Sequence, residues 1–183
     1  RLFGSNNKHR HNFPCIMMDL VKDSSWEILV TLLESGRLLY VHGAPLCGTA
    51  SRAREKREPE AMKRKGAQRG HEFPEGLPGW KGTVLQRVLA ANTIHEKMTD
   101  FLGRCDERGT GVSVESPTNS HMWLTKWFRK LLRRGSFREV RFQNCMRGGT
   151  RDKKSSWWTN VAELSVLAVM CDGSHEHEAW GAA

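Results

Sequence analysis

The chain has 183 residues, a length that suits one domain with a buried core. Its 29 Lys and Arg against 20 Asp and Glu give a net charge of +9. This balance favours an anionic partner, with nucleic acid first, although a solvated basic surface without a ligand has the same composition. No apolar run is long enough to span a membrane, and nothing resembles a secretory signal. The five irregularly spaced cysteines do not resemble a disulfide framework, so we expect an intracellular, reducing compartment.

The first part of the chain has the pattern of a strand, a helix and a second strand. Phe13–Leu20 is an apolar run with Asp19 near its end and is predicted to be a strand. Asp23-Ser24-Ser25 is a helix-start signal, and Gly36 suits the position after the helix. The apolar run Leu38–Ala44 is predicted to be the next strand. Together these segments predict a βαβ unit with parallel strands.

The middle of the chain contains a basic segment and a helix. Residues 51–80 form a predicted basic surface insertion, and two interpretations stay open for it, an arm that contacts phosphates and a solvated face. Lys81–Asp106 has apolar residues at helical spacing. The chain is expected to form a single domain, residues 1–183.

The last part of the chain predicts strands around a helix. Gly111–Glu115 alternates as a strand, and Ser120 is expected to cap a helix over His121–Arg134. Arg138–Cys145 alternates again, and the stretch that contains Trp157 and Trp158 is predicted to form a hairpin with it. Adjacent residues of a strand face opposite ways, so one of the two Trp residues is expected in the core. Residues 171–183 are expected to form a polar tail.

One candidate catalytic pair is Cys47 with Glu115. Both lie at the carboxyl ends of predicted strands, and adjacent parallel strands would bring both residues to the same edge of the sheet. A thiolate beside a carboxylic acid suits the addition of a nucleophile to a heterocycle. From the spacing alone the simpler interpretations are a small buried Cys in a turn and a coincidental Glu at a strand end.

The tail holds a second cluster of candidate ligands, Cys171, His175 and His177, with Cys145 as a candidate fourth. Sulfur and imidazole ligands suit zinc. The Cys-x3-His-x-His spacing is not a standard finger, so a weakly coordinating polar tail is the favoured interpretation and no metal ligand is assigned. A small zinc-stabilised binding module stays open as a third hypothesis.

Basic side chains near the predicted strand ends and the hairpin are candidates for gripping phosphates, and an exposed Trp beside them could stack on a base. These candidates are Arg52, Arg54, Arg147, Arg151, Lys153 and Lys154.

Four stretches in order resemble the cytosine-C5 DNA methyltransferases, especially a divergent branch carried by retroelements and phages. Asp19-Leu20 resembles the acidic motif on the adenine side of the cofactor. The APLCG sequence at Ala44–Gly48 resembles the Pro-Pro-Cys loop, and VSVESP at Val112–Pro117 resembles the Glu-Asn strand end. Gln143–Asn160 resembles the later basic hairpin that ends in Trp-Thr-Asn.

The resemblance implies an α/β fold with a Rossmann-like methyltransferase core: a mostly parallel sheet with a C-terminal antiparallel hairpin. It implies S-adenosylmethionine as cofactor, with Asp19, Leu20 and Asn160 in its site, and DNA as partner in the nucleus. The target cytosine would be flipped out of the duplex, Cys47 would add to C6, and Glu115 would contact N3. For that contact the pKa of the Glu115 carboxyl would have to be raised.

The chain also departs from the family pattern. Pro-Pro-Cys is replaced by Pro45-Leu46-Cys47, and Glu-Asn by Glu115-Ser116. The glycine-rich first strand–loop–helix is missing, so the fold is expected to be N-terminally incomplete and the enzyme degenerate or truncated. The alternative function is a non-catalytic nucleic-acid-binding domain of a mobile-element polyprotein.

Overall fold

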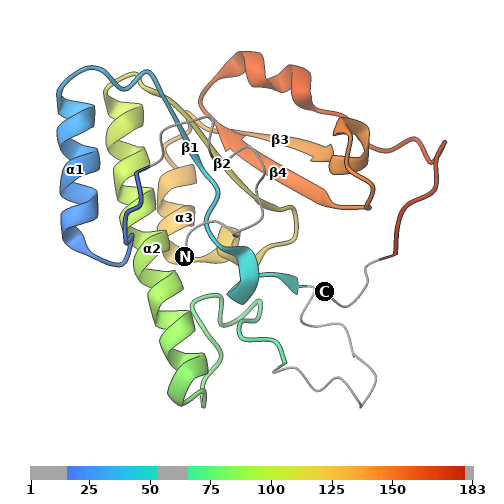
Figure 1. Ribbon diagram of the computed structural model, residues 1–183, viewed down its shortest axis with the longest axis horizontal. Coiled ribbons are helices and arrows are strands. Elements are labelled where there is room, and N and C mark those ends of the chain that lie inside the picture. The colour runs from blue at the N-terminus through green and yellow to red at the C-terminus, as the bar shows by residue number, and fades with distance from the viewer. Residues whose placement is uncertain (1–15, 53–65, 180–183) are drawn as a thin grey trace.

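The computed structural model describes residues 16–52 and 66–179 (Figure 1). None of the described helices has both the length and the apolar character needed to cross a membrane. Short 3₁₀ helices lie at Cys47–Thr49, His121–Leu124, Asn144–Arg147 and Ala162–Leu167. The regular elements are, in chain order, α1 (Asp23–Glu34), β1 (Tyr40–Gly43), α2 (Gly82–Glu107), β2 (Gly111–Pro117), α3 (Lys126–Leu132), β3 (Arg138–Gln143) and β4 (Lys154–Thr159).

The four strands form one mixed sheet in the order β1-β2-β4-β3. β1 pairs with β2 in parallel, whereas β4 pairs antiparallel with both β2 and β3. The fold is therefore α/β with the expected C-terminal antiparallel hairpin. The expectation of a mostly parallel sheet is wrong for the strand pairings, because β4 inserts between β2 and β3 and makes two of the three pairs antiparallel.

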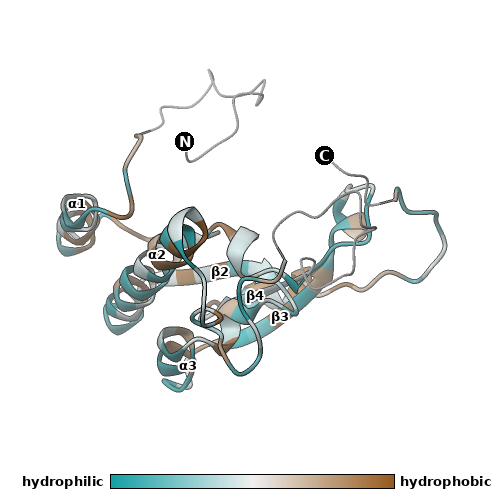
Figure 2. Ribbon diagram, turned by 90° about the horizontal axis from the view of Figure 1, so that it is seen from below, coloured by the Kyte–Doolittle hydropathy of each residue, from teal (hydrophilic) through white to brown (hydrophobic). Residues whose placement is uncertain are grey.

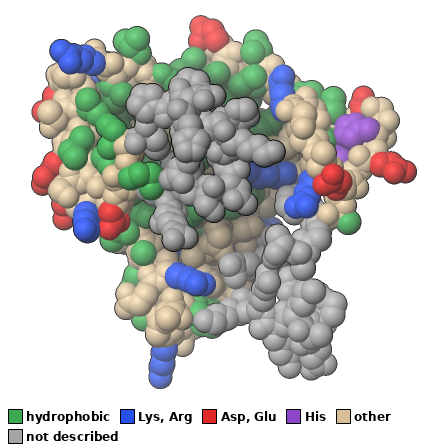
Figure 3. Space-filling view, viewed as in Figure 1, with side chains coloured by type: hydrophobic (Ala, Val, Ile, Leu, Met, Phe, Trp, Pro, Cys, Tyr) green, Lys and Arg blue, Asp and Glu red, His purple; other side chains and the backbone are tan. Residues whose placement is uncertain are grey.

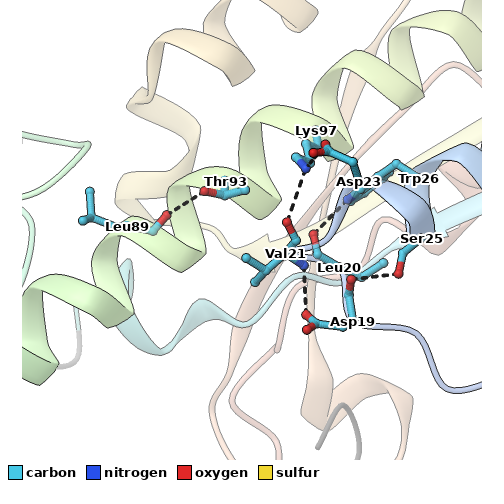
Figure 4. A network of polar contacts seen from close by, with 9 residues as sticks. All are labelled: Asp19, Leu20, Val21, Asp23, Ser25, Trp26, Leu89, Thr93 and Lys97. Atoms are coloured by element: carbon cyan, nitrogen blue, oxygen red, sulfur yellow. Dashed lines mark hydrogen bonds and ion pairs between the residues drawn. The ribbon is translucent and has the colours of Figure 1, made fainter.

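The predicted strand over Phe13–Leu20 is also wrong for the residues that the structure describes. Residues 16–20 have no strand, and Ile16 and Met17 are 79% and 52% exposed. Instead, Asp19 and Leu20 form a turn at the start of α1 (Figure 4). Residues 13–15 lie outside the described residues. The apolar run lacks a partner strand among the described elements, so no βαβ unit forms there.

Two predicted helices are confirmed. α1 ends just before Gly36, whose positive φ of 69° suits glycine. α2 covers nearly the whole predicted range. The two helices lie side by side (Figure 1), where Trp26 packs edge-on against Phe101 at 6.0 Å between ring centroids.

The predicted helix over His121–Arg134 is split in two. Ser120 does cap its start, since its Oγ accepts a hydrogen bond from the Met122 amide at 3.3 Å. The turn that follows is 3₁₀, and Thr125 interrupts it with an extended ψ of 148° before α3 begins. Thr125 is fully buried and donates its hydroxyl hydrogen bond to the Met122 carbonyl at 2.8 Å, so this break is a packed part of the fold.

The core lies between the sheet and the helices α2 and α3, which Figure 2 shows on the same side of the strands. Val112 and Val114 of β2 are fully buried with Leu102 of α2 and Phe128 of α3. Trp158 packs against this core, whereas Trp157 contacts His42 and Phe142 on the other side of the sheet. The prediction that the paired Trp residues separate is confirmed.

Part of the predicted basic surface insertion is packed inside the protein. Arg69 is only 1% exposed and donates hydrogen bonds to Thr49, Pro74 and Asn92. Burial lowers its pKa to about 10, partly offset by Glu75. The expectation of a surface position is wrong for Arg69. Its guanidinium can be buried because its N–H groups have hydrogen-bond acceptors there, and these bonds link two loops to a helix.

A buried histidine gives the fold a testable pH dependence. Burial, together with the charge of Arg69, lowers the pKa of His95 to about 3. The unfolded chain takes up this proton near pH 6.5, so between these values the unfolded state binds more protons than the folded state. Stability is therefore highest above about pH 6.5 and falls as the pH decreases.

We expect His95→Gln to reduce the slope of unfolding free energy against pH by up to about 1.4 kcal/mol per pH unit between about pH 4 and 6. Urea denaturation at several pH values measures this slope. His71→Gln is the matched control for the change of residue type, because His71 is exposed. An unchanged slope in His95→Gln would contradict the assignment.

Candidate active site at the carboxyl edge of the sheet

The parallel pair β1–β2 brings Cys47 and Glu115 to the same edge of the sheet. Gly43, the last residue of β1, lies opposite Val114, so Glu115 is one position beyond the paired residues. Cys47 follows β1 after three residues and opens a 3₁₀ helix. Cys47 and Glu115 are both partly buried.

The loop that carries Cys47 is fixed at two points. The Ala50 carbonyl accepts hydrogen bonds from the His121 amide at 2.9 Å and from Ser120 Oγ at 3.4 Å. Arg69 donates from Nε and Nη2 to Thr49 Oγ1, at 3.3 Å and 3.2 Å. The loop after β1 is therefore joined directly to the segment after β2 and, through Arg69, to α2.

Glu115 forms an ion pair with Lys153, whose Nζ donates to Oε1 at 3.1 Å. The two side chains are 20% and 35% exposed. Lys153 comes from the connection between β3 and β4, and its backbone is held there because the Lys153 carbonyl accepts from the Asn144 amide at 2.9 Å. Glu115 thus accepts a hydrogen bond from Lys153, whereas the resemblance requires an acid that donates one to the base.

A polar network covers the same face of the sheet beside Glu115. Tyr40 Oη and His42 Nδ1 both contact Ser113 Oγ, the latter at 2.6 Å, and the His42 ring lies 5.0 Å from the Trp157 ring. Burial lowers the pKa of His42, and the charge of Glu115 partly offsets this. His42 is therefore mostly neutral at neutral pH and can accept or donate one hydrogen bond beside the acid.

A cavity of about 420 Å³ lies next to this edge. It is lined by Arg52, His71 and residues of the segment 118–124 that follows β2. Neither Cys47 nor Glu115 lines it. The cavity is therefore adjacent to the predicted pair and does not enclose it.

The predicted phosphate-binding residues fall into different environments. Arg54 lies outside the described residues. Arg151 pairs with Glu178 at 3.6 Å, and Arg147 donates to the Val166 carbonyl at 3.3 Å. Lys154 is exposed, and Lys153 binds Glu115. On the face shown in Figure 3, the coloured Lys and Arg side chains are scattered among apolar and acidic ones.

The predicted cofactor residues are occupied by local hydrogen bonds. Asp19 accepts the Val21 amide at 3.1 Å, and the Leu20 carbonyl accepts Trp26 Nε1 at 2.8 Å (Figure 4). Asn160 Oδ1 accepts from the Val112 amide at 2.7 Å, and Nδ2 donates to Asp106 and Thr110.

These contacts do not fit S-adenosylmethionine. Asn160 has no remaining donor, and no strand precedes α1 within residues 16–52 to form a glycine-rich cradle. Among the described residues we therefore assign no group to the cofactor.

Four residues at or near the site are not predicted to have these roles from the sequence. Lys153 was expected to bind phosphate, and no pattern separates it from its basic neighbours as a partner of Glu115. Arg69 was grouped with the surface charges of the insertion for the same reason. Tyr40 and His42 had a usable signal, because period-two alternation in a strand places them on one face.

The structure also brings together Cys145, Cys171, His175 and His177, whose ligand atoms all lie within 4.8 Å of one another. These are the four residues for which the sequence leaves zinc binding as an open hypothesis.

Comparison with known proteins does not assign the chain to a family, because no protein-family model, curated protein or solved structure matches it.

The contact between Arg69 and Thr49 predicts a measurable change in the Cys47 loop. Thr49→Val removes the acceptor of a buried charged donor, so the unfolding free energy should fall by about 1–3 kcal/mol in urea denaturation. Alkylation of Cys47 by iodoacetamide, followed by mass spectrometry, should become faster because the loop loses one of its two anchors.

Thr31→Val is the matched control, since Thr31 is exposed on α1 and bonds only within its helix. It should change stability by less than about 0.5 kcal/mol. Equal effects of the two substitutions would mean that Arg69 does not anchor the loop.

Proposed function

We propose that this chain is a DNA cytosine-C5 methyltransferase-like domain, with Cys47 as the nucleophile and Glu115 and Lys153 as the groups that bind the base. The observation that carries the proposal is the Glu115–Lys153 pair at the edge to which the Cys47 loop also leads. The order of the sheet is compatible with it, because a parallel pair followed by an antiparallel hairpin is the ending that the resemblance implies.

The pair suits the polar edge of a flipped cytosine. That edge presents an acceptor at O2, an acceptor at N3 and a donor at the N4 amino group. An ammonium group donates to O2, and a carboxyl group accepts from N4 and donates to N3 once it holds a proton. A base that draws Lys153 onto O2 would weaken its ion pair with Glu115, and this favours protonation of the acid.

Addition of the Cys47 thiolate to C6 then forms an Sγ–C6 bond. The electron pair of the C5–C6 double bond moves to C5 and into the ring, where the proton that Glu115 supplies at N3 neutralises it. C5 then takes a proton from water and gives up its original hydrogen as a proton to the hydroxide formed; expulsion of the Cys47 thiolate, with return of the N3 proton to the Glu115 carboxylate, restores cytosine. This cycle exchanges the C5 hydrogen and needs no methyl donor.

S-adenosylmethionine would supply the methyl group in a complete enzyme. No group of the described residues fits it, so no step of the proposal passes through the cofactor.

A second candidate function is nucleic-acid binding without chemistry. It is supported by the net charge of +9 and by the ion pair that engages Glu115 with Lys153. The experiment below separates the two functions.

The proposed addition predicts exchange at C5 in the absence of any cofactor. DNA labelled with tritium at cytosine C5 should release tritium into water when it is incubated with the protein, and Cys47→Ala should abolish the release. Cys105→Ala is the matched control, because Cys105 is fully buried in α2 and its pKa is raised to about 11. A gel shift with a steep salt dependence but no tritium release would support the second function.

The role of Lys153 predicts a separate effect on the base. Lys153→Met keeps the length of the side chain but removes the donor to O2, so tritium release should fall about 10- to 100-fold, in line with the loss of a charged hydrogen bond. The control is Lys154→Met, since Lys154 is the exposed neighbour on the same hairpin. Equal losses in both variants would indicate a general charge effect instead of contact with the base.

A further inference from the structure

The C-terminal segment of the described chain is only partly buried. None of the residues from 160 to 179 is buried, and Val166 and Met170 are 78% and 48% exposed. The segment nevertheless follows a defined path: the Gln143 amide donates to the Val169 carbonyl at 2.9 Å, and the Glu178 amide donates to the Thr150 carbonyl at 2.9 Å. Such a segment needs another source of stability, because a few exposed hydrogen bonds do not offset the entropy of ordering it.

Four metal-binding side chains meet where this segment crosses the end of β3. Cys145 lies in the 3₁₀ helix Asn144–Arg147 directly after β3, while Cys171, His175 and His177 come from the C-terminal segment. All four cysteine and histidine ligand atoms lie within 4.8 Å of one another. The cysteines are free thiols.

The distances match a tetrahedral zinc site. With zinc bonds of about 2.3 Å to sulfur and about 2.05 Å to nitrogen, a tetrahedron places sulfur and nitrogen about 3.6 Å apart. Cys171 Sγ lies 3.5 Å from His177 Nε2 and 3.8 Å from His175 Nε2. Two thiols and two imidazoles within reach of one ion are the ligand set of structural zinc.

The surroundings position the ligands. The Gly173 amide donates to Cys171 Sγ at 3.3 Å. The Cys171 amide donates to Oε1 of the buried Gln143 at 2.8 Å, and Gln143 Nε2 donates to Asp152 at 2.8 Å. Near Cys145, Gly149 lies so close to Asn144 that a Cβ would come within 2.9 Å of the Asn144 carbonyl oxygen, so a tight turn fixes the first ligand.

We propose that Cys145, Cys171, His175 and His177 bind one zinc ion that fastens the C-terminal segment to the end of the β3–β4 hairpin. Four protein ligands fill the coordination sphere, so the site is structural, with no open position for substrate. The ion stabilises the connection from Asn144 to Lys154, the segment that presents Lys153 to Glu115. The site is independent of the proposed methyltransferase chemistry.

Metal analysis of protein purified under reducing conditions tests the proposal directly. We expect one zinc per chain, and a cobalt-substituted sample should have the absorption bands of a tetrahedral site with thiolate ligands. Cys171→Ala and His177→Ala should each reduce the zinc content from one equivalent to none. Cys105→Ala and His71→Ala, which change the same residue types outside the cluster, should retain it.

An experiment on the unmodified protein avoids variants that fail to fold. Removal of the metal by a chelator should expose residues 168–179 to proteolysis and make Cys145 and Cys171 react rapidly with iodoacetamide, whereas Cys47 should react at an unchanged rate. Re-addition of zinc should reverse these changes. A protein that holds no zinc after incubation with it, or that holds a Cys145–Cys171 disulfide instead, would overturn the proposal.

Discussion

The parallel pairing of β1 with β2 is the constraint on which the candidate site depends. Because Gly43 lies opposite Val114, Tyr40, His42, Ser113 and Glu115 share one face of the sheet. A slip of one residue in this register would turn every one of these side chains to the other face. The register is enforced from the core side, where Val112 and Val114 are fully buried and a Cβ on Gly43 would come within 3.0 Å of Met98 Sδ. Close packing of α2 on β1 therefore decides which residues the opposite face presents.

The loop after β1 depends on a different interaction, the burial of a charged side chain, which costs free energy of hydration. A buried guanidinium loses hydration, and only a full set of acceptors makes its burial tolerable. Arg69 finds these acceptors in the Cys47 loop, in the loop before α2 and in α2 itself. Burial lowers the pKa of His95 and the charge of Arg69 lowers it further, so the residue that orders the loop adds to the acid sensitivity of the core. The contacts that order the Cys47 loop therefore come with a lower stability of the fold at acidic pH.

The sequence predicted those parts of the fold that local pattern decides. The helical spacing of α2, the glycine after α1 and the alternation of β2 and β3 are properties of short stretches, and the structure has these elements within a few residues of the expected bounds. The strand at Phe13–Leu20 failed because an apolar run forms a strand only beside a partner, and the described residues offer none. The order of β4 in the sheet, the burial of Arg69 and the pairing of Lys153 with Glu115 are set by contacts between segments distant in the chain. Charge alone cannot separate such residues from solvated neighbours of the same type.

The groups proposed to bind the base are each held in place by a different part of the fold. Glu115 is fixed by the sheet, Cys47 by the Arg69 hydrogen bonds and the contact of Ala50 with His121, and Lys153 by the β3–β4 connection. The proposed zinc ion would act on the last of these, because Cys145 lies at the start of that connection and the C-terminal segment bonds to Thr150 within it. The residues expected to bind the cofactor serve the fold instead: Asp19 and Leu20 are part of a helix-start turn, and Asn160 completes the hydrogen bonds of β2 and α2. The described hydrogen bonds therefore use these three residues to hold the chain together, whereas they hold Glu115 and Lys153 against each other at the end of the sheet.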